Sequence, residues 1–298
     1  GLIQDLGIGG IIFMQGNPID QVKVNTTYQK ESKIPLFMAT DAEWGLSMRL
    51  SQTSDFPFQM TLGALADDDL IYDMGFEIGL QMRRLGLHIN FAPVIDINNN
   101  PFNPVINYRS FGESRTRVTQ KSIAYMKGLE AAGIMAVAKH FPGHGDTQTD
   151  SHYSLPIIEH ERARLDSIEL YPFRKLIQED VAGIMMAHIN VPALDATPKQ
   201  AATLSKKIAT DLLKTEMGFK GLVFTDAMNM KGVTSGHDLG IPELMAYLAG
   251  NDIIEFSLNI SASITQIQDA LKAGSLTTDQ IEIKCRRILH QNYKLWRH

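Results

Sequence analysis

Seven short apolar runs, each followed by a helical pattern, constrain the fold of this 298-residue chain more than any other feature. They have the composition of strands buried on both faces of a sheet, and they span residues 9–14, 35–40, 87–96, 133–138, 182–189, 221–225 and 252–256. Residues 1–7 read as the tail of a helix, so we expect an eighth strand upstream of residue 1. The pattern predicts an α/β fold: a (β/α)8 TIM-type barrel, its first βα unit incomplete, as a single domain over residues 1–298.

A doubly wound open sheet is the alternative fold for the same alternation. The two folds differ in where they bring the polar residues that follow five of the strands: Asp41, Arg109, His140, His188 and Asp226. In a barrel the carboxyl ends of the strands share one face, so these side chains converge, whereas in an open sheet they lie along an edge. Convergence of so many polar residues favours the barrel.

The long connection from Lys139 to Pro156 is too rich in His and Asp for a passive linker. Within it, Asp150 and His152 are two residues apart, so in an extended segment both side chains project to the same side. A carboxylate that holds an imidazole fixes its tautomer and raises its pKa, which makes His152 a candidate proton donor and acceptor. A surface histidine beside an N-cap aspartate is the equally simple structural interpretation.

A metal site is a second interpretation of the same loop, because imidazole and carboxylate groups suit zinc. Its candidate ligands would be His140, His144, Asp146, Asp150 and His152. His140 closes a strand while the others lie on a glycine-broken loop, so no regular helical pair of ligands is visible. We therefore rank a metal site second and expect neither metal nor cofactor.

Composition excludes several other classes of partner. The chain has 28 basic and 33 acidic residues, a net charge of −5, and no basic stripe with interleaved aromatic residues, so nucleic acid is not an expected partner. The longest apolar runs fall well short of the roughly 20 residues that span a bilayer. Cys285 is the single cysteine, which rules out an intramolecular disulfide.

Substrates with many hydroxyl groups, such as sugars, suit this set of residues. It comprises a carboxylate after a strand, a proton-transfer pair on a loop and several hydrogen-bonding residues. In retaining glycoside hydrolysis, a carboxylate attacks the anomeric carbon while an acid protonates the leaving oxygen and later deprotonates water. Asp226 is the candidate nucleophile, with His152 as the acid and base. The alternative interpretation of Asp226 is an N-cap in the turn between a strand and the next helix.

The segment Lys139–Thr147, together with Asp150-Ser151-His152 and Leu155-Pro156, closely resembles the signature of β-N-acetylglucosaminidases in glycoside hydrolase family 3. The resemblance extends over residues 9–256. It implies that Asp226 is the nucleophile and that His152, oriented by Asp150, is the general acid/base. It also implies sugar contacts from Asp41, Arg49, Arg109, Lys139 and His140.

The implied activity is retaining, exo-acting hydrolysis of terminal β-linked N-acetylglucosamine from peptidoglycan fragments or chitooligosaccharides, through a covalent glycosyl-Asp226 intermediate. A small carbohydrate would be the substrate, and further domains in the natural chain are compatible with the sequence. The sequence departs from the family at Trp44 and Leu46, which affects the expected shape of the outer pocket, and at Ala227-Met228 after the nucleophile.

Several alternatives to hydrolysis by this mechanism stay open. Within the family, they are a phosphorylase, because a neutral imidazole acid would not repel phosphate, and a β-glucosidase. A metal-dependent hydrolase and a non-catalytic sugar-binding barrel are the alternatives of other classes.

Overall fold

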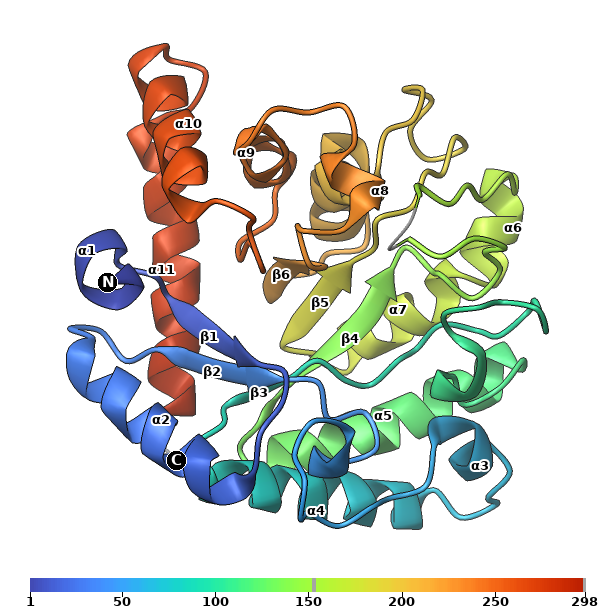
Figure 1. Ribbon diagram of the computed structural model, residues 1–298. Helices are drawn as coiled ribbons and strands as arrows, with labels where there is room; N and C mark the ends of the chain where they lie inside the picture. Colours follow the sequence, from blue (N-terminus) through green and yellow to red (C-terminus); the bar gives the residue numbers. More distant parts are fainter. Residues whose placement is uncertain (152–153, 297–298) are drawn as a thin grey trace.

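The computed structural model describes residues 1–151 and 154–296 of the chain. Six strands form one parallel sheet, and their spatial order is their order in the sequence. The strands are β1 (Gly10–Phe13), β2 (Phe37–Thr40), β3 (Ile89–Asn90), β4 (Met135–Phe141), β5 (Gly183–Met186) and β6 (Leu222–Thr225). Figure 1 shows this sheet curling from β1 round to β6.

The helices are α1 (Leu2–Leu6), α2 (Pro18–Glu31), α3 (Gln59–Gly63), α4 (Asp69–Arg84), α5 (Arg115–Ala131), α6 (Arg162–Ser167), α7 (Leu170–Gln178), α8 (Lys231–Thr234), α9 (Ile241–Ala249), α10 (Ile260–Lys272) and α11 (Thr278–Leu295). Shorter 3-10 helices span Leu46–Met48, Asn107–Arg109 and Ala202–Leu204, and Lys207–Glu216 is a π-helix. No described helix is both long and apolar enough to cross a membrane.

Alternate residues of the strands serve two different apolar clusters. In β2, Met38 belongs to the large cluster that the helices share, whereas Phe37 and Ala39 belong to a smaller cluster on the inner face of the sheet. In β4 the same alternation puts Ala136 in the outer cluster and Val137 in the inner one. Side chains alternate between the faces of a strand, so both faces of the curled sheet are buried.

The helices α4 and α5 pack very closely on the outer side of the sheet (Figure 1). Glycines permit this approach: a Cβ atom on Gly128 would lie 2.1 Å from the carbonyl oxygen of Tyr72, and one on Gly75 would lie 2.5 Å from that of Tyr125. The helix α5 also packs against β4.

The sheet is a partial TIM-type barrel, so the prediction of an eight-fold barrel is wrong for the part of the chain that the structure describes. The run over residues 252–256 contributes one bridge, from Ile253 to Phe224 of β6, rather than a seventh strand. Instead of further strands, α11 packs Ile288 and Leu295 against the inner cluster. Its Asn292 side chain donates a hydrogen bond to the carbonyl oxygen of Pro35, 2.7 Å away, just before β2. That residues 1–298 make a single domain stays a prediction.

Candidate active site

A pocket of about 320 Å³ lies at the carboxyl ends of the strands. The predicted site residues that line it are Asp41, Arg49, Arg109, Lys139, His140 and Asp226. A larger cavity of about 650 Å³ lies elsewhere, beside Arg84 and Trp296, and none of the predicted site residues that the structure describes lines it. The strand ends therefore converge, although the barrel is only partial.

The remaining predicted site residues are Asp150 and His152. Asp150 is partly buried and is not among the residues that line the pocket, although its neighbour Ser151 is. His152 lies outside the described residues. The orientation of His152 by Asp150, and the roles of both residues, therefore stay predictions.

Ion pairs connect the charged side chains along one wall of the pocket. Lys139 Nζ lies 2.8 Å from Asp41 Oδ1 and 2.8 Å from Glu43 Oε1. Arg109 binds the same Glu43 carboxylate with two donors, Nε at 2.9 Å and Nη2 at 2.7 Å. Arg49 pairs with Asp41. Cations and carboxylates thus alternate, and their side chains hold one another in place before a ligand enters.

These contacts keep the groups charged. Burial opposes the ionisation of Asp41 and Glu43. The positive charges of Lys139 and Arg49 outweigh burial at Asp41, and those of Arg109 and Lys139 outweigh it at Glu43. The pKa of each carboxyl group is therefore below its ordinary value. Conversely, the neighbouring carboxylates overcome burial and raise the pKa of Lys139 and of Arg109. Fixed charges of both signs in a partly enclosed pocket are suited to binding hydroxyl groups, which both donate and accept hydrogen bonds.

Asp96, at the end of the third apolar run, organises the turn after β4. Its carboxylate accepts hydrogen bonds from the backbone amides of His140 at 3.1 Å and of His144 at 2.6 Å, and it pairs with His140 Nδ1 at 2.7 Å. Burial lowers the pKa of His144 to about 4, so its ring is neutral at pH 7. The His144 ring contacts the hydroxyl oxygens of Thr147 at 2.8 Å and Ser151 at 3.2 Å. His144 therefore supports the loop, and it also lines the pocket.

Asp226 follows β6 directly, and its side chain is partly buried in the pocket. The amide of Ala227 donates to Asp226 Oδ1 at 2.7 Å. Burial favours the neutral acid, but His188, His140, this amide and Lys139 outweigh it and lower the pKa of Asp226 below its ordinary value. Asp226 is therefore an ionised carboxylate at neutral pH.

The N-cap interpretation of Asp226 is wrong, because the next helix, α8, begins only at Lys231 with Met230 in the N-cap position. His188 interacts electrostatically with Asp226 but does not line the pocket. It is fully buried, with Nδ1 2.8 Å from Thr203 Oγ1 and Nε2 3.1 Å from the carbonyl oxygen of Ala227. Of the five polar residues expected to converge, His188 is thus the one that supports the pocket from behind.

Three aromatic rings form the rim of the pocket. The Trp44 and Phe58 ring centroids are 4.8 Å apart, and those of Phe58 and Tyr108 are 4.7 Å apart. Trp44 and Tyr108 line the pocket, and 47% of Tyr108 is exposed. Within the first departure from the family pattern, Trp44 therefore shapes the mouth, whereas Leu46 belongs to the outer core.

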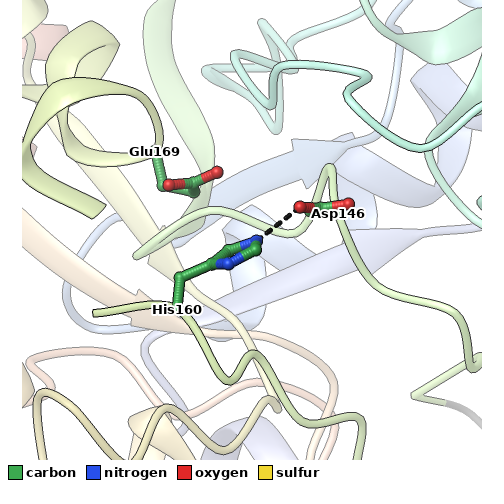
Figure 2. A group of neighbouring side chains, drawn as sticks. All are labelled: Asp146, His160 and Glu169. Carbon is green, nitrogen blue, oxygen red and sulfur yellow. Dashed lines mark hydrogen bonds and ion pairs between the residues drawn. The ribbon is translucent and has the colours of Figure 1, made fainter. Parts of the chain in front are cut away.

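A second polar cluster joins the two ends of the loop after β4 (Figure 2). His160 Nε2 lies 2.5 Å from Asp146 Oδ2, and donor atoms of Asp146, His160 and Glu169 all lie within 4.8 Å of one another, as a metal site would require. However, Arg164 Nη1 donates to both Glu169 oxygens at 2.6 and 2.7 Å, and Arg164 Nη2 lies 3.7 Å from Asp146 Oδ2. Because the Arg164 guanidinium already pairs with these carboxylates, we interpret the cluster as an ion-pair network that closes the loop.

The predicted metal ligands that the structure describes belong to two different polar clusters. His140 and His144 are bound to Asp96, whereas Asp146 belongs to the cluster with His160. Among the described residues, these three therefore do not form one metal-binding group.

The sequence analysis missed three carboxylates of this region: Glu43, Asp96 and Glu255. Glu43 and Glu255 line the pocket. Each of the three lies at or just after the end of an apolar run, which is the signal that identified Asp41 and Asp226. Glu43 in particular follows Asp41 by only two residues.

Among curated proteins, beta-hexosaminidase A of Pseudoalteromonas piscicida is 35% identical to this chain, with 99% of the chain and 54% of that protein covered. A beta-N-acetylglucosaminidase/beta-glucosidase of Cellulomonas fimi is 27% identical, with 97% and 52% covered. The chain thus spans about half the length of these relatives.

A solved structure of a glycoside hydrolase family 3 beta-N-acetylglucosaminidase from Paenibacillus sp. str. FPU-7 matches with a TM-score of 0.94 and 35% identity, over 99% of this chain and 58% of that one. The beta-glucoside phosphorylase BglX matches with a TM-score of 0.93 and 25% identity, over 97% and 54%. The model of the glycosyl hydrolase family 3 N terminal domain matches residues 1–291. This chain therefore belongs to glycosyl hydrolase family 3.

Proposed function

We propose that this domain carries the active site of a retaining exo-β-N-acetylglucosaminidase, which releases terminal N-acetylglucosamine from peptidoglycan fragments or chitooligosaccharides. The observation that supports this most is that an ionised carboxylate, Asp226, lines the same pocket as Arg109 and Lys139. The similarity to family 3 enzymes named for N-acetylglucosamine or hexosamine glycosides adds to it.

In the proposed reaction, Asp226 attacks the anomeric carbon and the bond to the leaving oxygen breaks. His152 gives its proton to that oxygen and then takes a proton from water, which hydrolyses the glycosyl-Asp226 intermediate. Asp150 would hold the His152 imidazole in the tautomer that this requires. An attacking carboxylate must be ionised, and the cationic surroundings of Asp226 satisfy that requirement.

The remaining pocket residues would bind the sugar. Asp41, Arg49, Arg109, Lys139 and His140 are the proposed contacts. Because Lys139 and Arg109 share Glu43, they are held at fixed positions in which they can donate to hydroxyl or amide oxygens without first reorganising.

Replacement of the nucleophile tests the proposal. In the full-length protein we expect Asp226→Ala to reduce release from an aryl N-acetylglucosaminide by about 10⁴-fold or more, and added azide to restore turnover with an α-glycosyl azide as the product. The exposed Asp269→Asn is the control and should be fully active. Undiminished activity of Asp226→Ala would contradict the proposal.

The acid role of His152 has a separate signature. His152→Ala should affect aryl substrates with good leaving groups less than substrates with a sugar leaving group, because the former barely need protonation. Equal losses on both substrates would count against that role.

A phosphorylase or a β-glucosidase is the second candidate, favoured by the similarity to BglX and to the bifunctional Cellulomonas fimi enzyme. Products formed with and without phosphate distinguish the reactions: a sugar 1-phosphate as main product would replace hydrolysis by phosphorolysis. Parallel assays on aryl N-acetylglucosaminide and aryl glucoside decide the sugar.

A further inference from the structure

Glu255 lies beside the proposed nucleophile and has no part in the reaction described above. It lines the pocket and is 6% exposed. Its backbone is fixed to the chain around Asp226: the Glu255 amide donates to Thr225 Oγ1 at 2.9 Å, and the Glu255 carbonyl oxygen accepts from the amide of Met228 at 2.9 Å. The preceding Ile253 pairs with β6 and packs on the inner apolar cluster. Glu255 is thus held where the apolar core ends and the polar pocket begins.

The carboxyl group of Glu255 is enclosed without a matching partner. Its Oε1 atom is buried and makes no hydrogen bond within residues 1–151 and 154–296. Burial raises the pKa of Glu255 well above its ordinary value, the negative charges of Asp226 and Asp41 raise it further, and Lys139 offsets this only in part. Burial and the neighbouring carboxylates thus favour the protonated form of this carboxyl group, which has one O–H donor.

We propose that Glu255 is a substrate-contacting residue, which donates a hydrogen bond from its enclosed carboxyl group to an oxygen of the sugar bound in the pocket. This inference rests on the proposed function. Buried polar groups are nearly always hydrogen-bonded, and a ligand rich in oxygen supplies the partner that Glu255 lacks. A neutral donor also adds a contact beside Asp226 without placing a second negative charge next to the attacking carboxylate.

A purely structural role explains Glu255 less well. The neighbouring Ile253, Ile254 and Phe256 are apolar, so an apolar residue would complete this segment without enclosing an unpaired oxygen. A residue that is unfavourable for the folded protein and faces a pocket is expected where a ligand makes use of it.

Two substitutions of similar size separate donor chemistry from packing. Glu255→Gln keeps an N–H donor and should lower kcat/KM for the aryl N-acetylglucosaminide by no more than a few-fold. Glu255→Leu removes the donor and should lower it by about 10- to 100-fold, and should weaken the binding of N-acetylglucosamine in calorimetric titration by a similar factor. All variants are made in the full-length protein, and thermal unfolding checks that each is folded.

Glu130 on α5 provides a matched control. It also has an enclosed Oε1 atom without a hydrogen bond in the described part of the chain, and burial raises its pKa to about 7, but it does not line the pocket. Glu130→Leu should therefore leave kcat/KM unchanged. If Glu255→Leu does not fold, Glu255→Asp takes its place, since it keeps the buried acid but withdraws the donor by one methylene and should lose activity.

The outcomes are distinct from those of the nucleophile test. If Asp226→Ala is inactive but Glu255→Leu, or Glu255→Asp in its place, binds and cleaves sugar like the unaltered protein, the contact from Glu255 is refuted while the proposed function stands. If Glu255→Gln loses as much activity as Glu255→Leu, the donor role is refuted. If Asp226→Ala is fully active, the proposed function itself fails.

Discussion

Glu43 offers the most direct test of how the pocket is held together. Its side chain is fully buried between Arg109 and Lys139, at 2.7 to 2.9 Å from their donor nitrogens. At an effective dielectric constant of 20, each such contact gives about 6 kcal/mol of attraction before the loss of hydration is subtracted. Glu43→Gln removes the negative charge but keeps the volume, so Arg109 loses its bidentate partner and Lys139 retains only Asp41.

Loss of one member of a buried ion pair destabilises proteins by about 3–5 kcal/mol, because the other charge stays buried. We expect Glu43→Gln to lower the free energy of unfolding by that amount. With about 2–4 °C for each kcal/mol in large domains, Tm should fall by about 6–20 °C in scanning calorimetry. The exposed pair of Asp269 and Lys272 is the control, and Asp269→Asn should leave Tm unchanged.

The pH dependence of this difference has a fixed sign. Burial opposes ionisation of Glu43, but Arg109 and Lys139 hold its pKa well below the ordinary value of 4.5. A depressed pKa stabilises the folded protein fully above pH 4.5, and this contribution is lost as the pH falls toward the folded-state pKa. The Tm difference between the two proteins should therefore be largest near neutral pH and shrink in acid. An unchanged Tm at pH 7, or a difference that grows in acid, would refute the reasoning.

Three further outcomes are expected. Gly145→Ala should reduce kcat/KM by about 10- to 100-fold, because its Cβ would lie 1.7 Å from the carbonyl oxygen of Ile97 and must displace the loop, whereas Gly9→Ala, with nothing within 4 Å, should be silent. Trp44→Ala should lower kcat/KM by up to about 10-fold on a disaccharide of N-acetylglucosamine but not on the methyl glycoside, which has no second ring to stack on the rim. Chelation with EDTA should leave activity unchanged because Arg164 already pairs with the Asp146 and Glu169 carboxylates; a loss restored by zinc would favour the metal-dependent alternative.

The positions of the strands and the gathering of polar residues at their ends could be predicted from local signals. Buried parallel strands are continuous apolar runs, and the residue at which such a run stops marks the carboxyl edge of the sheet. That rule selected Asp41, Arg109, His140, His188 and Asp226, and all of them except His188 line one pocket. It needs no knowledge of how many strands the sheet finally has.

Closure of the barrel could not be predicted, because it depends on contacts between segments far apart in the chain. The run over residues 252–256 has the pattern of a strand, yet it forms only a single bridge to β6. Its Glu255 side chain lines the pocket. The apolar face of α11 is typical of any surface helix, and nothing local indicates that Ile288 and Leu295 pack on the inner face of the sheet. Likewise, nothing in the sequence around Asp96 indicates that its carboxylate binds His140 and His144, which are more than 40 residues away in the chain.

The two carboxyl groups Asp226 and Glu255 share one pocket but have opposite surroundings. Asp226 receives the Ala227 amide and the positive potential of His188, His140 and Lys139, which keep it ionised. Glu255 is buried and faces the negative charge of Asp226, and both effects raise its pKa. When the surroundings lower the pKa of one carboxyl group and raise that of its neighbour, the first can act as an anion and the second as a hydrogen-bond donor. In the proposed reaction, the surroundings of Asp226 favour the charge that nucleophilic attack requires, and those of Glu255 favour the proton that donation requires, so the two proposed roles are not interchangeable.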